Sequence, residues 1–138
     1  MSDELTFQVH IMKKRRGAIE LREGAAPPPP PPPARVPARI ARLVAVAHRV
    51  ESLVRNGEVA DYADVAQAAG ITRARVSQLI NLLLLAPDIQ EQLLFMVRPA
   101  RGCDAIGEQH VRSIVLEPDW AKQRRMFAEL TARKHATH

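Results

Sequence analysis

The sequence predicts a mainly α-helical protein, and both its composition and its pattern of apolar residues support this. Aromatic residues make up 4% of the 138 residues, whereas alanine, leucine, valine and isoleucine are common. This composition suits close helix packing better than a β-sandwich or a β-barrel. From Pro37 onward, apolar residues recur at steps of three and four, the spacing of one helix face. We therefore expect a small helical bundle over residues 37–135.

Charge and cysteine content narrow the classes of function. The chain has 20 Lys and Arg against 15 Asp and Glu, a formal net charge of +5 that favours a polyanionic partner, nucleic acid first. Residues 34–57 concentrate this excess, with five arginines and one glutamate. The single cysteine, Cys103, excludes an internal disulfide and a cysteine-based zinc site. Because no signal peptide or long apolar span is present, we expect a cytoplasmic, nucleoid-associated protein without membrane contact.

Residues 1–24 predict a β-hairpin arm. Residues 5–11 alternate between apolar and polar side chains, the pattern of a half-buried strand. The basic run at 13–17 predicts a turn into a second short strand around 18–21. An isolated two-stranded hairpin is only marginally stable in water, so its apolar face needs the helical domain, another copy of the chain or a partner.

Residues 25–36 predict a stiff linker. Pro27 to Pro33 are consecutive prolines, which lack backbone donors and favour polyproline II. We favour a rigid spacer between the arm and the helical domain, although such a run also suits ligands of SH3 or WW domains.

The helical region divides into six expected helices, at about 37–56, 62–69, 73–82, 87–96 and 104–115, with a last one from about 118. Asp61 and Thr72 are expected to cap the second and third helices, and Gly57 and Gly70 to end the first and second. The apolar side chains expected in the core are Ile40, Leu43, Val44, Ala47, Val50, Leu53, Val54, Val65, Ala66, Ala69, Val76, Leu79, Ile80, Leu82, Ile89, Leu93, Leu94, Ile106, Val111, Ile114, Trp120, Phe127 and Leu130.

The second and third helices, over 61–82, predict a helix-turn-helix. Two short helices joined by three residues must cross steeply. A small Ala66 allows their close approach, Gly70 allows a turn with positive φ, and Ile71 is expected to plug the junction. Val76 and Leu79 then face the core, which leaves a polar face outward.

That outward face suits a helix that reads the major groove of DNA, where short or polar residues at the helix start let the backbone approach the bases. Arginines can reach guanine or phosphate, glutamine and asparagine can pair with adenine, and serine can contact either. A generic helical hairpin, in which glycine and alanine serve only packing, is the alternative. The residues expected to contact DNA are Thr72, Arg73, Ala74, Arg75, Ser77, Gln78 and Asn81, with Arg39 and Arg42 on phosphates.

Two resemblances add to this reading. The run 65–91, carried by Gly70–Leu79 and Leu83–Gln90, resembles the helix-turn-helix domain of the ParB/KorB partition proteins. Ile106–Ile114 is similar to a helix that packs on the same domain in that family, where His110 and Arg112 either contact phosphate or serve packing and surface charge. The order of basic hairpin, proline-rich spacer, helix-turn-helix and the closing segment Pro118–Arg125 is similar to the C-terminal region of some serine site-specific recombinases of mobile elements.

The resemblances imply DNA recognition by Thr72, Arg73, Ala74, Ser77 and Gln78. They imply neither CTP-driven clamping nor strand cleavage, because nothing here resembles the partition proteins' nucleotide-binding domain and the chain has no room for the recombinases' catalytic domain. The scattered histidines lack metal-ligand spacing, and Ser77 has no recognisable base. We therefore expect no enzyme, no metal, no cofactor and no small-molecule substrate.

The sequence thus predicts double-stranded DNA binding, as a regulator or accessory factor of a mobile element or recombinase. Since one such domain reads few base pairs, we expect a homodimer or a recombinase partner. The alternative is a protein-interaction adaptor that uses the N-terminal hairpin and the proline-rich linker, with the helical domain as a scaffold that does not bind DNA.

Overall fold

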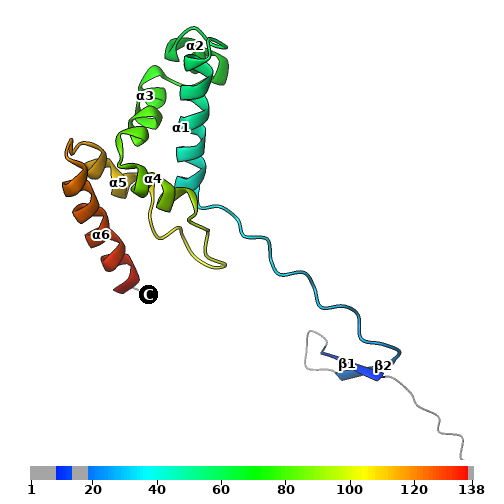
Figure 1. Cartoon of the computed structure of the whole chain (residues 1–138). Helices are drawn as coiled ribbons and strands as arrows, with labels where there is room; N and C mark the ends of the chain where they lie inside the picture. The colour runs from blue at the N-terminus through cyan, green and yellow to red at the C-terminus, as the bar shows by residue number, and fades with distance from the viewer. Residues whose placement is uncertain (1–8, 14–18, 137–138) are drawn as a thin grey trace, which may run out of the picture. The chain divides into compact units, whose positions relative to one another are not determined.

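The computed structural model describes residues 9–13 and 19–136, with side chains from residue 24 onward. Backbone contacts divide the chain into two units, residues 1–34 and residues 35–138 (Figure 1).

The first unit contains two paired strands. Strand β1 (Val9–Lys13) pairs antiparallel with β2 (Ile19–Glu23), with Val9 opposite Glu23 and Lys13 opposite Ile19. The predicted first strand began at residue 5, and its residues 5–8 lie outside the described residues, as do residues 14–17 of the predicted turn. The prolines that follow are exposed and belong to no helix or strand.

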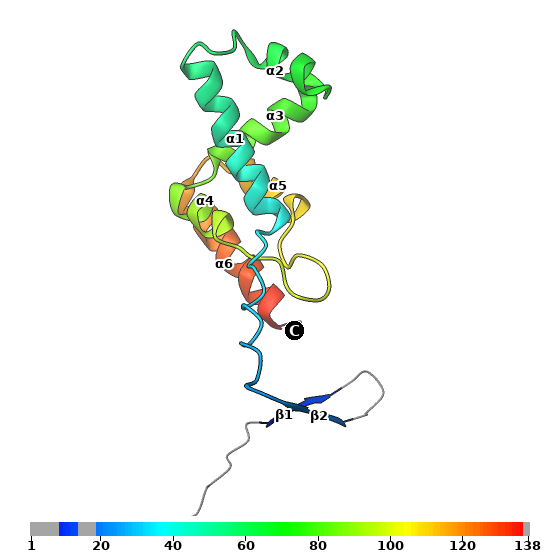
Figure 2. The ribbon, with the colours of Figure 1, turned by 90° about the vertical axis from the view of Figure 1, so that its right-hand side faces the viewer.

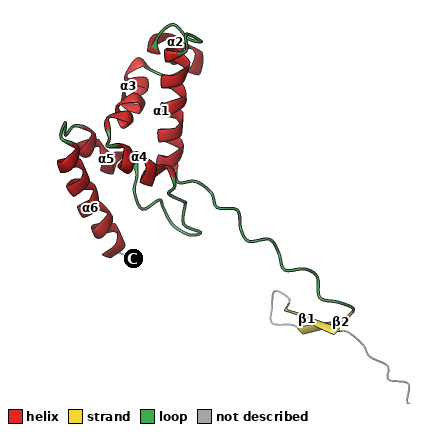
Figure 3. Ribbon diagram, viewed as in Figure 1, coloured by secondary structure: helices red, strands yellow, loops and turns green. Residues whose placement is uncertain are grey.

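The second unit is mainly helical, as predicted. Within residues 35–136 all regular structure is helix, apart from one isolated bridge between Pro37 and Val97 (Figure 3). The elements are α1 (Arg39–Arg55), α2 (Tyr62–Ala69), α3 (Arg73–Asn81), the 3₁₀ helix η1 (Leu82–Leu84), α4 (Pro87–Leu94), α5 (Glu108–Val115) and α6 (Trp120–Ala136).

The main core is a cluster of buried residues from α1, η1, α4, α5 and α6 and the segments that join them. Helix α4 packs against the N-terminal part of α1 (Figures 1 and 2). The members of the cluster are Ala38, Ile40, Ala41, Val44, Leu82, Leu85, Ala86, Ile89, Leu93, Ile106, Val111, Ile114, Phe127 and Leu130.

A second and smaller cluster holds α2 and α3 against α1. It consists of the buried side chains of Val50, Ala66 and Val76, with Val65 and Ile80 packed against them. Helix α2 lies near the C-terminal end of α1, and α3 runs beside α1 (Figure 2). We call this cluster the α2–α3 core.

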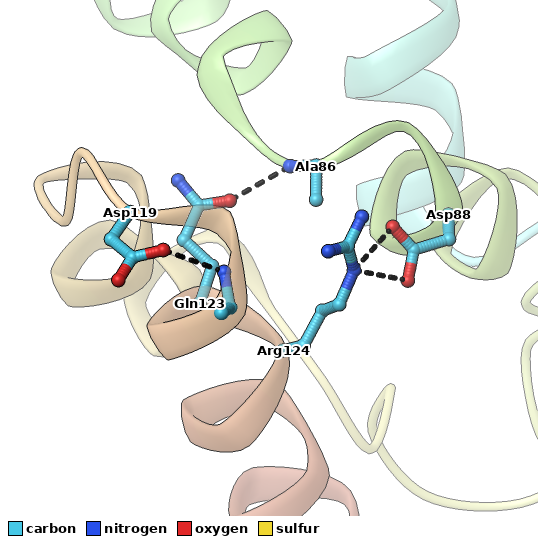
Figure 4. Close-up of polar contacts among 6 residues, drawn as sticks. Ala86, Asp88, Asp119, Gln123 and Arg124 are labelled. Carbon is cyan, nitrogen blue, oxygen red and sulfur yellow. Dashed lines mark hydrogen bonds and ion pairs between the residues drawn. The ribbon is translucent and has the colours of Figure 1, made fainter.

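A buried glutamine joins α6 to the start of α4. Gln123 is 1% exposed, and its Oε1 accepts a hydrogen bond from the Ala86 backbone N–H at 2.8 Å (Figure 4). Its Nε2 donates to the carbonyl oxygens of Leu84 and Glu117. Beside it, Arg124 Nε pairs with the Asp88 carboxylate at 3.1 Å (Figure 4). The amide oxygen and both amide hydrogens of Gln123 are thereby hydrogen-bonded, which makes Gln123 a structural residue.

Several predicted core residues lie at the surface instead. Ile71 is 39% exposed, because the α2–α3 core already closes the junction with small side chains. Trp120 is 47% exposed, since it stands at the first position of α6 and Gln123 takes the buried place one turn later. Ala69 and Leu94 are also exposed.

Two helix starts differ from the sequence prediction. Helix α1 begins at Arg39 rather than 37, because the backbone before it pairs with the chain after α4: Ala38 N donates to Met96 O and Arg98 N to Val36 O. Residues 104–107 are not helical; Asp104 Oδ2 instead accepts from the Arg39 backbone N–H at 2.7 Å. Asp104 thus satisfies a free donor at the start of α1 from 65 residues away.

Candidate nucleic-acid interface

The turn between α2 and α3 is set by three local features. Asp61 Oδ1 accepts from the Asp64 backbone N–H at 2.9 Å, which caps the start of α2. Gly70 ends α2 in the left-handed conformation, with φ +66° and ψ +31°. Thr72 Oγ1 accepts from the Arg75 backbone N–H at 3.1 Å and starts α3. The chain therefore reverses into α3 within three residues.

Helix α3 has one buried side and one exposed polar side. Val76 is 1% exposed and Leu79 is 6% exposed, and both point toward the rest of the helical unit. The opposite side carries short or polar residues of the kind that a groove-binding helix needs near its start. Those that are exposed are Thr72, Arg73, Ala74, Ser77, Gln78 and Asn81.

Arg75 differs from its neighbours because it is bonded within the protein. Its Nη1 donates to Glu108 Oε1 of α5 at 2.6 Å and to Gln78 Oε1 at 3.2 Å. The side chains of Arg75 and Glu108 are 29% and 15% exposed. The hydrogen bond that Arg75 donates to Glu108 raises the pKa of Arg75, because the carboxylate stabilises the charged guanidinium.

Two cavities border α5, one shared with the polar side of α3 and the other with the start of α1. The first, of about 210 Å³, lies between α3 and α5 and is lined by Gln78, Asn81, Leu82, Glu108, Arg112, Val115 and Leu116. The second, of about 330 Å³, is lined by Arg39, Ile40, Leu43, Cys103, Asp104, Gly107, Glu108, Gln109 and Arg112. Because Glu108 and Arg112 line both, these residues of α5 connect the α3 surface with the start of α1.

The arginines predicted on α1 are both exposed, and one of them lines a cavity of this region. Arg39 lines the second cavity together with Arg112. Arg42 lines neither cavity. Arg112 is exposed and was not among the predicted contact residues; the only sequence signal for it was the resemblance of Ile106–Ile114 to a helix that packs on such a domain.

His110 has a structural contact on the other side of α5. Its Nδ1 accepts from the Gly107 backbone N–H at 2.9 Å, at the start of the helix. Partial burial, with a smaller contribution from Lys134, lowers the pKa of His110 below its ordinary value. The lowered pKa favours the neutral imidazole, whose Nδ1 caps the start of α5, a role that differs from a charged contact to phosphate.

Over residues 9–13 and 19–136, no group of three or more His, Cys, Asp and Glu side chains is arranged to hold a metal ion. No helix in the same residues is both long enough and apolar enough to cross a membrane.

Comparison of the chain with protein-family models, with curated proteins and with solved structures finds no match. The functional assignment therefore depends on the arrangement of its own residues.

Proposed function

We propose that the protein binds double-stranded DNA as a helix-turn-helix protein, with α3 in the major groove. The observation that carries this proposal is the exposed polar side of α3, which starts at the capping residue Thr72 and is opposed by the buried Val76 and Leu79. The major groove admits an α-helix, and polar side chains at the start of that helix can reach base edges.

The residues of this surface suit distinct roles. Thr72, Ala74 and Ser77 are short, so they let the α3 backbone approach the bases. Arg73, Gln78 and Asn81 carry side chains that can hydrogen-bond base edges in the groove. The exposed Arg39 and Arg42 of α1, with Arg112 of α5, are positively charged groups available to neutralise phosphates.

Within the cell we propose a nucleoid-associated regulator or accessory factor of a mobile element or recombinase. The resemblance of 65–91 to partition-protein domains and of the segment order to recombinase C-terminal regions supports this role. One such surface contacts only a few base pairs, so useful affinity requires a homodimer or a recombinase partner.

The test is selection of bound sequences from a random duplex pool, followed by fluorescence anisotropy at two salt concentrations. Arg73→Ala/Gln78→Ala is expected to lower the preference for the selected duplex over a random one by about 30-fold or more, since two base contacts are removed and each contributes about 1–3 kcal/mol. Arg55→Ala/Gln92→Ala makes the same changes at exposed positions of α1 and α4 and should leave the preference intact. A folded wild-type chain that binds no duplex at low salt would contradict the proposal.

That negative result would favour the second candidate function, a protein-interaction adaptor. Two observations support it: Pro27 to Pro33 are exposed, and Phe95 and Leu116 are 76% and 81% exposed. Large apolar side chains at such exposure are typical of surfaces that bind other proteins when they form patches.

A further inference from the structure

Glu108 of α5 is an acidic residue beside the polar side of α3, and its position is unusual for a DNA-binding surface. It lines both cavities beside α3 and α1, among arginines, and its side chain is 15% exposed. A carboxylate at this place would repel phosphate unless its charge were compensated. Arg75 provides the compensation, with Nη1 at 2.6 Å from Glu108 Oε1.

The same Nη1 atom of Arg75 also bonds Gln78 on the exposed side of α3. An arginine Nη1 carries two hydrogens. One is donated to Glu108 and the other to Gln78 Oε1, one turn further along α3. Glu108, Arg75 and Gln78 thus form a chain of hydrogen bonds from α5 to the polar side of α3.

The chemistry of arginine fixes how Gln78 is oriented. Arginine has only hydrogen-bond donors, so the atom of Gln78 that faces Arg75 must be the amide oxygen, and the amide NH₂ must point the other way. Gln78 therefore presents two donors. Guanine offers two acceptors, N7 and O6, in the major groove, whereas adenine requires one donor and one acceptor from its partner.

We infer that Glu108 is a positioning residue for DNA recognition: through Arg75 it holds Gln78 as a donor that selects guanine, and it keeps the charge of Arg75 from adding to sequence-independent binding. This inference rests on the proposed DNA binding. It differs from the sequence expectation, in which Gln78 pairs with adenine and Arg75 contacts DNA directly.

The first test uses Glu108→Gln in the full chain, measured by anisotropy with the selected duplex and a random duplex. Removing the carboxylate leaves the charge of Arg75 available to a phosphate. The slope of log K against log salt should become steeper by about 0.9, and random-duplex affinity should rise about eightfold at 0.1 M salt. Preference for the selected duplex should also fall, because Gln78 is no longer held in one orientation.

Two control variants separate positioning from stability or from general charge. Glu129→Gln makes the same change at an exposed position of α6 and should leave slope and preference unchanged. In an Arg75→Ala background, Glu108→Gln should still strengthen random-duplex binding by removing a charge that repels phosphate, but it should no longer change which base is preferred, because the side chain that orients Gln78 is absent. If Glu108 is only structural, Glu108→Gln will lower the melting temperature without changing slope or preference, and the inference is wrong.

The second test repeats the selection of sequences with variants. Gln78→Ala should lose preference at one base position, which identifies the base that Gln78 contacts. Wild type should select guanine there, and Arg75→Ala, which frees the Gln78 oxygen, should shift that position toward adenine. The same base selected by both chains would overturn the inference while leaving the proposed function standing. Absence of any duplex binding by wild type would instead overturn the proposed function itself.

Discussion

The two cores of the helical unit differ in size, and the smaller one supports the proposed DNA-binding surface. The main core contains fourteen buried residues, whereas the α2–α3 core contains Val50, Ala66 and Val76. Burial stabilises by about 25 cal/mol per Å² of apolar surface, so three small side chains contribute little. Helices α2 and α3 are therefore expected to open more readily than the rest of the unit. The surface proposed to read DNA thus lies over the smaller of the two cores.

The largest effect is expected from the main core. Ile89 is 1% exposed in α4, and Ile89→Ala should lower the free energy of unfolding by about 2–5 kcal/mol through lost burial and the cavity left behind. The whole helical unit should be destabilised, because this core holds α1, against which α2 and α3 pack. Urea unfolding followed by circular dichroism measures this free energy of unfolding. Leu94→Ala, at the exposed end of the same helix, is the control and should cost far less.

The same substitution made in each core compares their contributions to stability most directly. Val44 and Val76 are 0% and 1% exposed, so Val44→Ala and Val76→Ala remove the same buried methyl groups. Each should cost about 2 kcal/mol, from about 0.8 kcal/mol per methylene-sized group plus a cavity contribution. Native-state hydrogen exchange should show faster exchange throughout the unit for Val44→Ala, but mainly in 62–81 for Val76→Ala. Identical exchange patterns would show that the two cores are a single cooperative unit.

A smaller effect is expected at the turn between α2 and α3. Gly70 has φ +66°, and a Cβ built there has no atom within 4 Å. Gly70→Ala therefore meets no steric clash, and its cost is the left-handed backbone, about 1–2 kcal/mol. The melting temperature in thermal unfolding measures this loss of stability. Gly70→Asn should cost less, because asparagine tolerates this conformation; equal stability of wild type and Gly70→Ala would mean that the turn relaxes.

The smallest effect concerns pH. The pKa of His110 is lowered in the folded state, so the folded protein binds this proton less well than the unfolded chain does. The contribution of His110 to the free energy of unfolding is complete above the ordinary histidine pKa of 6.5. It is lost as pH falls through the pKa that His110 has in the folded protein. Protonation at Nδ1 also removes the acceptor for Gly107 N–H. The melting temperature should decrease from pH 7 to 5, and less so in His110→Gln, which retains an acceptor but does not titrate.

The sequence predicted the elements that depend on near neighbours. The spacing of apolar residues located the helices, and the caps Asp61 and Thr72 and the terminating Gly70 lie where short-range rules place them. The exposure of Arg73, Gln78 and Asn81 follows from the same periodicity, because Val76 and Leu79 occupy the buried side of α3.

The contacts that sequence reasoning missed join residues far apart in the chain. Glu108 meets Arg75 across 33 positions, and Asp104 caps α1 across 65. Gln123 is buried only because Ala86 and Leu84 offer backbone partners from another helix end. No local pattern marks such pairs, because each side chain alone is typical of a solvated helix surface.

The central claim is that the polar side of α3 contacts DNA, and an amide chemical-shift titration of the ¹⁵N-labelled chain with the selected duplex tests it most directly. The largest shift changes are expected within residues 72–81, with smaller ones at Arg39 and Arg112 and none in the middle of α6. Changes confined to residues around the exposed Phe95, with 72–81 unaffected, would contradict the claim.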